Sequence, residues 1–213
     1  MPAARLAEVT TSHRRRFAAD LIEHAAIELF LAQPIENVTI NQLAETAGVS
    51  VRNFYRYFAS KEEIMLAQPM RRAEAIRSAT SARPASERPF EAMRAAIDAL
   101  SGSDDPDLRR WQRAVSRGRA VDRMQQSVVA VTSPILSRAL ADRAGTSPLD
   151  LWPDVAGVTV ATALVVGARR WAVEGGSLRT HILRAIDIVG AGLHPGPPMA
   201  SRPAREGKPD SAR

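Results

Sequence analysis

Residues 39–61, TINQLAETAGVSVRNFYRYFASK, decide the fold of this chain. Thr39 opens a T-x-x-Q capping box, a pattern that begins a helix. Gly48 follows about two turns later, where a tight turn needs a positive φ. Ser50 then begins a second short helix, and Ser60 begins a third in the S-x-x-E form. The stretch therefore predicts a helix-turn-helix, the motif that presents its second helix to the major groove of DNA.

The composition excludes several kinds of chemistry. Cysteine is absent, so disulfides, thiol catalysis and cysteine-bound zinc are excluded. The four histidines are scattered without metal-ligand spacing, and we predict neither a metal site nor a cofactor. A net charge of +6 favours a nucleic-acid partner. The first 61 residues nevertheless hold 7 basic and 6 acidic side chains, so the prediction depends on the motif and not on the charge.

No segment has the pattern of a signal peptide or of a membrane span. The N-terminus lacks the apolar core of a signal peptide. The longest uncharged apolar run, residues 155–168, has 14 residues, whereas a spanning helix needs about 20. We therefore expect a cytoplasmic protein with no membrane partner.

Apolar residues recur at spacings of three and four along the chain without the alternation of strands, which predicts an all-α fold. We expect a flexible arm at residues 1–12, a helix-turn-helix domain at 13–62, a larger helical domain at 63–193 and a disordered, proline-rich tail at 194–213. The expected helices are residues 14–32, 40–47, 51–57, 61–79, 89–100, 105–116, 121–131, 135–144, 149–174 and 178–193. Pro134 is expected to separate the two helices on either side of it.

The quoted stretch resembles the TetR family of bacterial one-component repressors. The family pattern runs roughly T-[IV]-x-x-[IL]-A-x-x-A-G-V-S-x-x-x-[LF]-Y-x-[HY]-F-x-[SN]-K-x-x-[IL]. The matching positions are Thr39, Ile40, Leu43, Ala44, Ala47, Gly48, Val49, Ser50, Phe54, Tyr55, Tyr57, Phe58, Ser60, Lys61 and Ile64. The chain departs from the family after the first helix, where Pro34 and Ile35 replace the usual glycine and aromatic residue. The resemblance is specific over residues 14–65. It implies an N-terminal DNA-binding domain and a C-terminal helical domain that binds an effector and dimerises.

A few side chains around the second helix are candidates for contact with double-stranded DNA. Arg52 is the candidate for sequence readout, because a guanidinium pairs bidentately with guanine O6 and N7. Val51 is placed to meet a thymine methyl group. The resemblance implies phosphate contacts for most of the others. The full candidate set is Thr39, Asn41, Val51, Arg52, Asn53, Tyr55, Arg56, Tyr57 and Lys61. The alternative for Arg52 and Arg56 is a solvated helix face, and the ring of Tyr55 serves either packing or DNA.

The last two helices indicate a homodimer through Val155–Val173 and Thr180–Gly192. The first of them is apolar on more than one face, and such a helix needs burial on both sides, in its own core and against a partner. The resemblance implies that these two helices form a four-helix interface with the second subunit. The alternative is that they only complete the core of a monomer.

The effector is harder to identify from the sequence. An arginine-rich stretch at residues 108–123 surrounds Trp111 and indicates an anionic ligand with an apolar tail, such as an acyl-CoA. The candidate residues are Met93, Trp111, Arg113, Arg117, Met124 and Trp171. The alternative is an amphipathic helix with a solvated arginine face and Trp111 in the core.

The leading hypothesis is a homodimeric transcriptional regulator, a repressor released from a palindromic operator by a small molecule. An activator or a ligand-independent DNA-binding protein on the same fold is the alternative. An enzyme with an appended helix-turn-helix is disfavoured, because the sequence has no G-x-S-x-G, phosphate loop or paired acids in a cleft context. A helical protein-interaction module would leave residues 39–61 unexplained.

Overall fold

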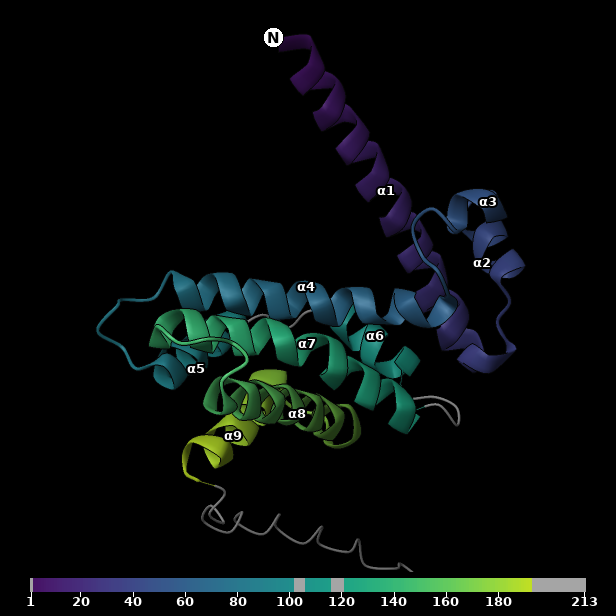
Figure 1. Cartoon of the computed structure of the whole chain (residues 1–213). Helices are drawn as coiled ribbons and strands as arrows, with labels where there is room; N and C mark the ends of the chain where they lie inside the picture. Colours follow the sequence, from purple (N-terminus) through teal and green to yellow (C-terminus); the bar gives the residue numbers. More distant parts are fainter. Residues whose placement is uncertain (1, 102–105, 116–120, 193–213) are drawn as a thin grey trace, which may run out of the picture.

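The fold is seen in a computed structural model, which describes residues 2–101, 106–115 and 121–192 (Figure 1). Its helices are α1 Pro2–Ala32, α2 Ile40–Thr46, α3 Val51–Phe54, α4 Lys61–Ser81, α5 Pro89–Leu100, α6 Pro106–Val115, α7 Val121–Ala144, α8 Leu151–Glu174 and α9 Leu178–Gly190, with a 3-10 turn, η1 Ile35–Asn37, after α1. The described part contains no strand, which confirms the all-α class. The tail predicted at residues 194–213 lies outside the described residues.

Helix α4 connects the two halves of the molecule. It begins just after α2 and α3, lies alongside α7 and packs against α5 and α1 (Figure 1). Beyond it, α8 packs on α7 and α9 packs on α8. Helix α6 contacts both α1 and α8, so it bridges the N-terminal helices and the larger domain.

Small residues allow α8 to approach its neighbours closely. A Cβ atom at Gly157 would lie 2.1 Å from Ser137 Oγ on α7, and one at Gly167 would lie 3.0 Å from the His181 carbonyl on α9. Ala161, like these two glycines, is buried. The small residues of α8 therefore serve close packing within this chain, whereas several of its larger apolar side chains, among them Val155, Val158 and Val173, are exposed.

Helix α8 is also long and apolar enough, by length and composition, to cross a membrane. It has 24 residues, and the mean hydropathy of its most apolar window is 1.5. In this fold it lies between α7 and α9, with 39% of that window buried. The helix is thus packed against two neighbours on one side and keeps exposed apolar side chains such as Val155 and Val158 on the other.

Two helix boundaries differ from the sequence prediction. The first helix begins at Pro2, so residues 2–12, expected as an arm, continue α1. Residues 3–8 of this segment, AARLAE, are all strong helix formers, which favours the extension.

The second difference is that α7 runs through Pro134 without a break, so the predicted division into 121–131 and 135–144 is wrong. An internal proline costs about 3 kcal/mol. Val128, Leu136 and Leu140 are buried on both sides of it, where α7 packs against α4 and α8. This tertiary packing outweighs the local preference of proline.

Candidate DNA-binding surface and ligand cavity

The start of α2 is fixed by the predicted capping box. The backbone N–H of Gln42 donates to Thr39 Oγ1 at 3.2 Å, and the N–H of Thr39 donates to Gln42 Oε1 at 2.9 Å. Leu43 and Ala44 are buried on the inner side of the helix. Two hydrogen bonds and one apolar face therefore hold a seven-residue helix that would not be stable alone.

The turn and the start of α3 also follow the sequence. Gly48 has φ +66°, the left-handed conformation that glycine adopts without strain. Ser50 Oγ then accepts the backbone N–H of Asn53 at 3.1 Å, which caps α3. These two features set the direction in which α3 leaves α2.

Helix α3 is shorter than predicted. It ends at Phe54, and the segment expected to continue it to residue 57 forms a tight turn. The N–H of Arg56 donates to the Asn53 carbonyl at 3.1 Å, and that of Tyr57 donates to the Phe54 carbonyl at 2.9 Å. These i to i−3 bonds wind the chain more tightly than an α-helix. Arg56 and Tyr57 therefore lie on a turn beyond the helix.

The α3 segment has a buried face and an exposed face. Phe54 is fully buried and Phe58 is 6% exposed, whereas Tyr55 is 56% and Val51 37% exposed. Arg52, Asn53 and Arg56 are exposed as well. The rings of Tyr55 and Phe54 meet edge to face with their centroids 5.6 Å apart, so Tyr55 packs on the core while more than half of it stays exposed.

Three of the polar candidates form one cluster at the end of α3. Arg56 Nη1 donates to Asn53 Oδ1 at 3.3 Å, and the guanidinium lies 6.0 Å from the centre of the Tyr57 ring. Arg52 is placed one turn earlier, near the N-terminus of the helix. The exposed surface therefore divides into a leading edge with Val51 and Arg52 and a trailing cluster around Arg56.

The remaining candidates lie at the starts of α2 and α4. Thr39 and Asn41 are exposed. Lys61 Nζ donates to the carbonyls of Val38 and Glu36 at 2.8 and 3.2 Å, which ties the start of α4 to η1. Sequence reasoning placed Lys61 among the phosphate contacts and did not anticipate this second, structural role.

A partly enclosed cavity of about 90 Å³ lies between α4, α6, α7, α8 and α9. Its inner wall is apolar, with residues such as Ile76, Val128 and Leu164. Polar side chains also line it: Gln68, Arg72, Gln112, Gln125, Thr132 and Arg169. Arg169 Nη1 is 3.4 Å from Gln125 Oε1, and Arg72 Nη2 is 3.4 Å from the Leu100 carbonyl. The cavity thus combines an apolar interior with two guanidinium groups.

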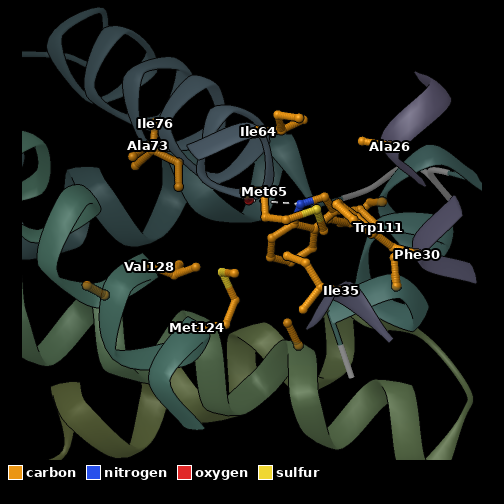
Figure 2. Close-up of a cluster of buried hydrophobic side chains, with 14 of the residues drawn as sticks. Ala26, Phe30, Ile35, Ile64, Met65, Ala73, Ile76, Trp111, Met124 and Val128 are labelled. Carbon is orange, nitrogen blue, oxygen red and sulfur yellow. Dashed lines mark hydrogen bonds between the residues drawn. The ribbon is translucent and has the colours of Figure 1, made fainter. Parts of the chain in front are cut away.

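The predicted effector residues divide into two groups. Trp111 and Met124 line the cavity, and both lie in the cluster of buried side chains in Figure 2. Met93, Arg113 and Trp171 do not line it: Met93 is fully buried, Arg113 is exposed, and the indole of Trp171 donates to the Gly176 carbonyl at 3.1 Å. Arg117 lies outside the described residues.

Sequence reasoning missed Arg72 and Arg169, and the reason is geometric. The two arginines lie almost a hundred residues apart, on α4 and α8, and only tertiary packing brings both to one cavity. Within the described residues, no group of three His, Cys, Asp or Glu side chains could hold a metal ion.

Comparison with known proteins matches residues 22–67 to a family model described as bacterial regulatory proteins of the tetR family. The transcriptional regulator TcmR of Streptomyces glaucescens is 44% identical over 87 residues, which are 41% of this chain and 38% of TcmR. The match thus spans well under half the length of that relative. A candidate mycofactocin biosynthesis regulator, MftR of Mycobacterium tuberculosis, is 27% identical over 197 residues, 87% of this chain and 96% of MftR.

The fold extends the likeness beyond the matched residues. FadR of Thermus thermophilus, a TetR-family transcriptional repressor solved with lauroyl-CoA, superposes with a TM-score of 0.53 at 20% identity, over 85% of this chain and 98% of FadR. The helix-turn-helix at residues 39–61, the family model over the same region and the shared all-α architecture agree with one another. Residues 22–67 therefore form the N-terminal domain of the tetR family of bacterial regulatory proteins.

Proposed function

We propose that the chain is a homodimeric, sequence-specific DNA-binding regulator, a repressor that leaves a palindromic operator when a small molecule binds. The observation that carries this proposal is α3, a capped helix with a buried aromatic face and an exposed face bearing Arg52, Asn53 and Val51. A helix-turn-helix reads base edges with the first residues of its second helix. As a DNA-binding regulator, the protein is expected in the cytoplasm.

The exposed face of α8 supports the dimer. Leu151, Val155, Val158, Val166 and Val173 are 80, 56, 42, 37 and 82% exposed. With Thr162 between Val158 and Val166, most of their spacings are three or four residues, which puts them on one side of the helix. The Thr162 hydroxyl bonds to the Val158 carbonyl at 2.9 Å, so the stripe offers few unmet polar groups. A contiguous apolar face of this length is typical of a protein–protein interface.

A two-fold symmetric dimer formed through α8 would present two copies of α3 to the same duplex. Paired recognition helices about 34–36 Å apart contact successive major grooves on one side of the duplex. A symmetric dimer then selects a palindrome, because each protomer reads an identical half-site.

The cavity supports an effector that is anionic at one end and apolar at the other. Arg72 and Arg169 provide positive charge, and residues such as Ile76 and Val128 provide the apolar interior. Guanidinium groups bind carboxylates and phosphates well. The similarity to FadR, which was solved with lauroyl-CoA, concerns only the fold. An acyl-CoA nevertheless combines the anionic head and the apolar tail that this cavity favours.

The proposal is tested by fluorescence anisotropy on DNA that flanks the gene of this protein, with excess random duplex as competitor. We expect tight binding of two protomers per site, or a multiple of two, and release of the duplex by lauroyl-CoA. Binding that the random duplex removes equally well would contradict sequence-specific recognition of this DNA. Tight binding that lauroyl-CoA leaves unchanged would contradict an acyl-CoA effector while leaving the DNA-binding function standing.

A further inference from the structure

Helix α4 contains a proline in its first half, and this residue leaves a carbonyl without its helical partner. In an α-helix the N–H of each residue donates to the carbonyl four positions earlier. Pro69 is buried inside α4 and has no N–H, so the Met65 carbonyl receives no such bond. Met65 is itself 1% exposed, so water does not easily replace the missing donor.

The missing donor is supplied from another helix. Trp111 of α6 donates its indole N–H to the Met65 carbonyl at 3.0 Å (Figure 2). The Trp111 side chain is 6% exposed, so the bond is shielded from solvent. A cross-helix hydrogen bond thus takes the place of the one that Pro69 removes.

This bond lies in the wall of the ligand cavity. Pro69 and Trp111 both line the cavity, together with Gln68 and Gln112 beside them in the sequence. The cavity holds about 90 Å³, less than the roughly 150 Å³ of an engineered cavity that accepts benzene. The enclosed part is therefore small for an apolar tail, and the Trp111 ring is one of the walls that such a tail would press against.

The same region is joined to the DNA-binding helices. Arg110, the neighbour of Trp111, forms an ion pair with Glu28 of α1. Arg71 Nη1 of α4 donates to Glu23 Oε1 of α1 at 2.6 Å. Figure 2 also shows Phe30 of α1 near Trp111 in the same buried cluster. A shift of α6 or a bend of α4 at Pro69 would therefore move α1, which packs against α2, and α2 in turn packs against α3.

We propose that the Trp111–Met65 hydrogen bond is the switch by which the cavity controls the DNA-binding helices. Without a ligand, the hydrogen bond stays intact and holds α4 in one conformation across Pro69. A ligand displaces the indole, the Met65 carbonyl loses its donor, and α4 bends at the position where its backbone ladder is already interrupted. This inference rests on the proposed function, because it names the regulation of the same cavity.

The bond itself is tested by a double-mutant cycle on thermal unfolding, which needs neither DNA nor ligand. Trp111→Phe keeps the ring and removes the donor, and Pro69→Ala restores the helical N–H. We expect Trp111→Phe to lower the melting temperature by about 2–4 °C in the natural chain and by less than half of that in the Pro69→Ala chain. An equal loss in both chains would overturn the inference.

Trp171→Phe is the matched control. Trp171 is 7% exposed and also donates its indole N–H to a carbonyl, that of Gly176, but it does not line the cavity. Trp171→Phe is expected to lower the melting temperature by the same amount whether position 69 holds proline or alanine. Pro134→Ala controls for the general effect of replacing a proline inside a helix.

The control of DNA binding is tested by the release factor, the ratio of the operator Kd with saturating lauroyl-CoA to the Kd without it. Couplings of this kind usually amount to a factor of about 5–150. We expect Trp111→Phe and Pro69→Ala to bring the factor below about two, and Trp171→Phe and Pro134→Ala to retain it. Full release in the first two variants would overturn the switch.

Amide hydrogen exchange separates failure of the switch from failure of the proposed function. If the natural chain binds no selected duplex, or if lauroyl-CoA does not release it, the proposed function or its effector class fails. Exchange across residues 66–73 still decides the switch. We expect faster exchange there in Trp111→Phe, natural rates when Pro69→Ala is added, and no change in Trp171→Phe. Identical exchange in all these chains would overturn the inference.

Discussion

At the scale of single residues, the exposed side of α3 places candidate base contacts and candidate phosphate contacts at different positions. Arg52 and Val51 are placed at its leading edge, where side chains of a recognition helix reach bases. Arg56 lies on the following turn with Asn53 and Tyr57. Base contacts confer sequence preference, whereas phosphate contacts confer affinity and salt dependence.

Arg52→Ala is expected to weaken binding to the operator by roughly 1–3 kcal/mol and to leave binding to random duplex nearly unchanged, because a lost base contact removes discrimination. Anisotropy titrations on the operator and on a random duplex of equal length measure both values. An equal loss on the two duplexes would show that Arg52 does not read sequence.

Lys61→Ala is expected to have two effects. The loss of its bonds to the Glu36 and Val38 carbonyls lowers the free energy of unfolding by about 1–2 kcal/mol. The loss of one phosphate contact reduces the slope of log K against log salt by about one unit. Denaturant unfolding and a salt titration measure the two effects separately.

Arg56→Ala is the matched comparison for Lys61. Arg56 is exposed and lies beyond the end of α3, so its loss is expected to change the salt slope with little effect on stability. A Lys61→Ala protein that is destabilised but keeps its full salt slope would leave Lys61 with a structural role only.

At the scale of the helices, the sequence predicted the elements whose signals are local. The caps at Thr39 and Ser50 and the positive φ of Gly48 depend on residues within a few positions, and all three were confirmed. The break expected at Pro134 was wrong, because burial of α7 against α4 and α8 outweighs the cost of one proline. The cavity could be predicted only in part, because its walls come from five helices.

The loop between α4 and α5 is held by one side chain that no local pattern predicts. Arg143 of α7 donates to the carbonyls of Thr80, Arg83, Pro84 and Glu87 at 2.6–3.1 Å. Arg143→Ala is expected to lower the free energy of unfolding by roughly 2–3 kcal/mol, because these carbonyls lose a charged donor.

Arg138 provides the control for this prediction. It is exposed on the same helix, and Arg138→Ala is expected to change stability by less than about 0.5 kcal/mol. Urea denaturation of both variants makes the comparison. Equal stability of the two variants would contradict the stabilising role of the Arg143 hydrogen bonds.

At the scale of the whole molecule, reading a palindromic operator requires two copies of the chain. A stable interface buries about 800 Å² on each partner. Val155→Glu places a charge in the first half of the exposed α8 stripe and is expected to give monomers at micromolar concentration, because an unpaired buried carboxylate is costly. Sedimentation velocity measures the assembly state.

Ser78→Glu, on the exposed side of α4, is the control and is expected to remain dimeric. A Val155→Glu protein that also remains dimeric would place the interface elsewhere. Operator affinity should fall together with dimerisation in Val155→Glu, because a monomer contacts a single half-site.

The proposed function depends above all on a preference of α3 for one sequence in duplex DNA. Selection of bound duplexes from a random pool, at near-physiological salt, tests it most directly because no target gene has to be assumed. We expect enrichment of one two-fold-symmetric sequence, which the protein binds about a thousandfold or more tightly than random duplex and which Arg52→Ala no longer enriches. A pool that stays random after repeated rounds, or one that Arg52→Ala enriches equally well, would contradict the account.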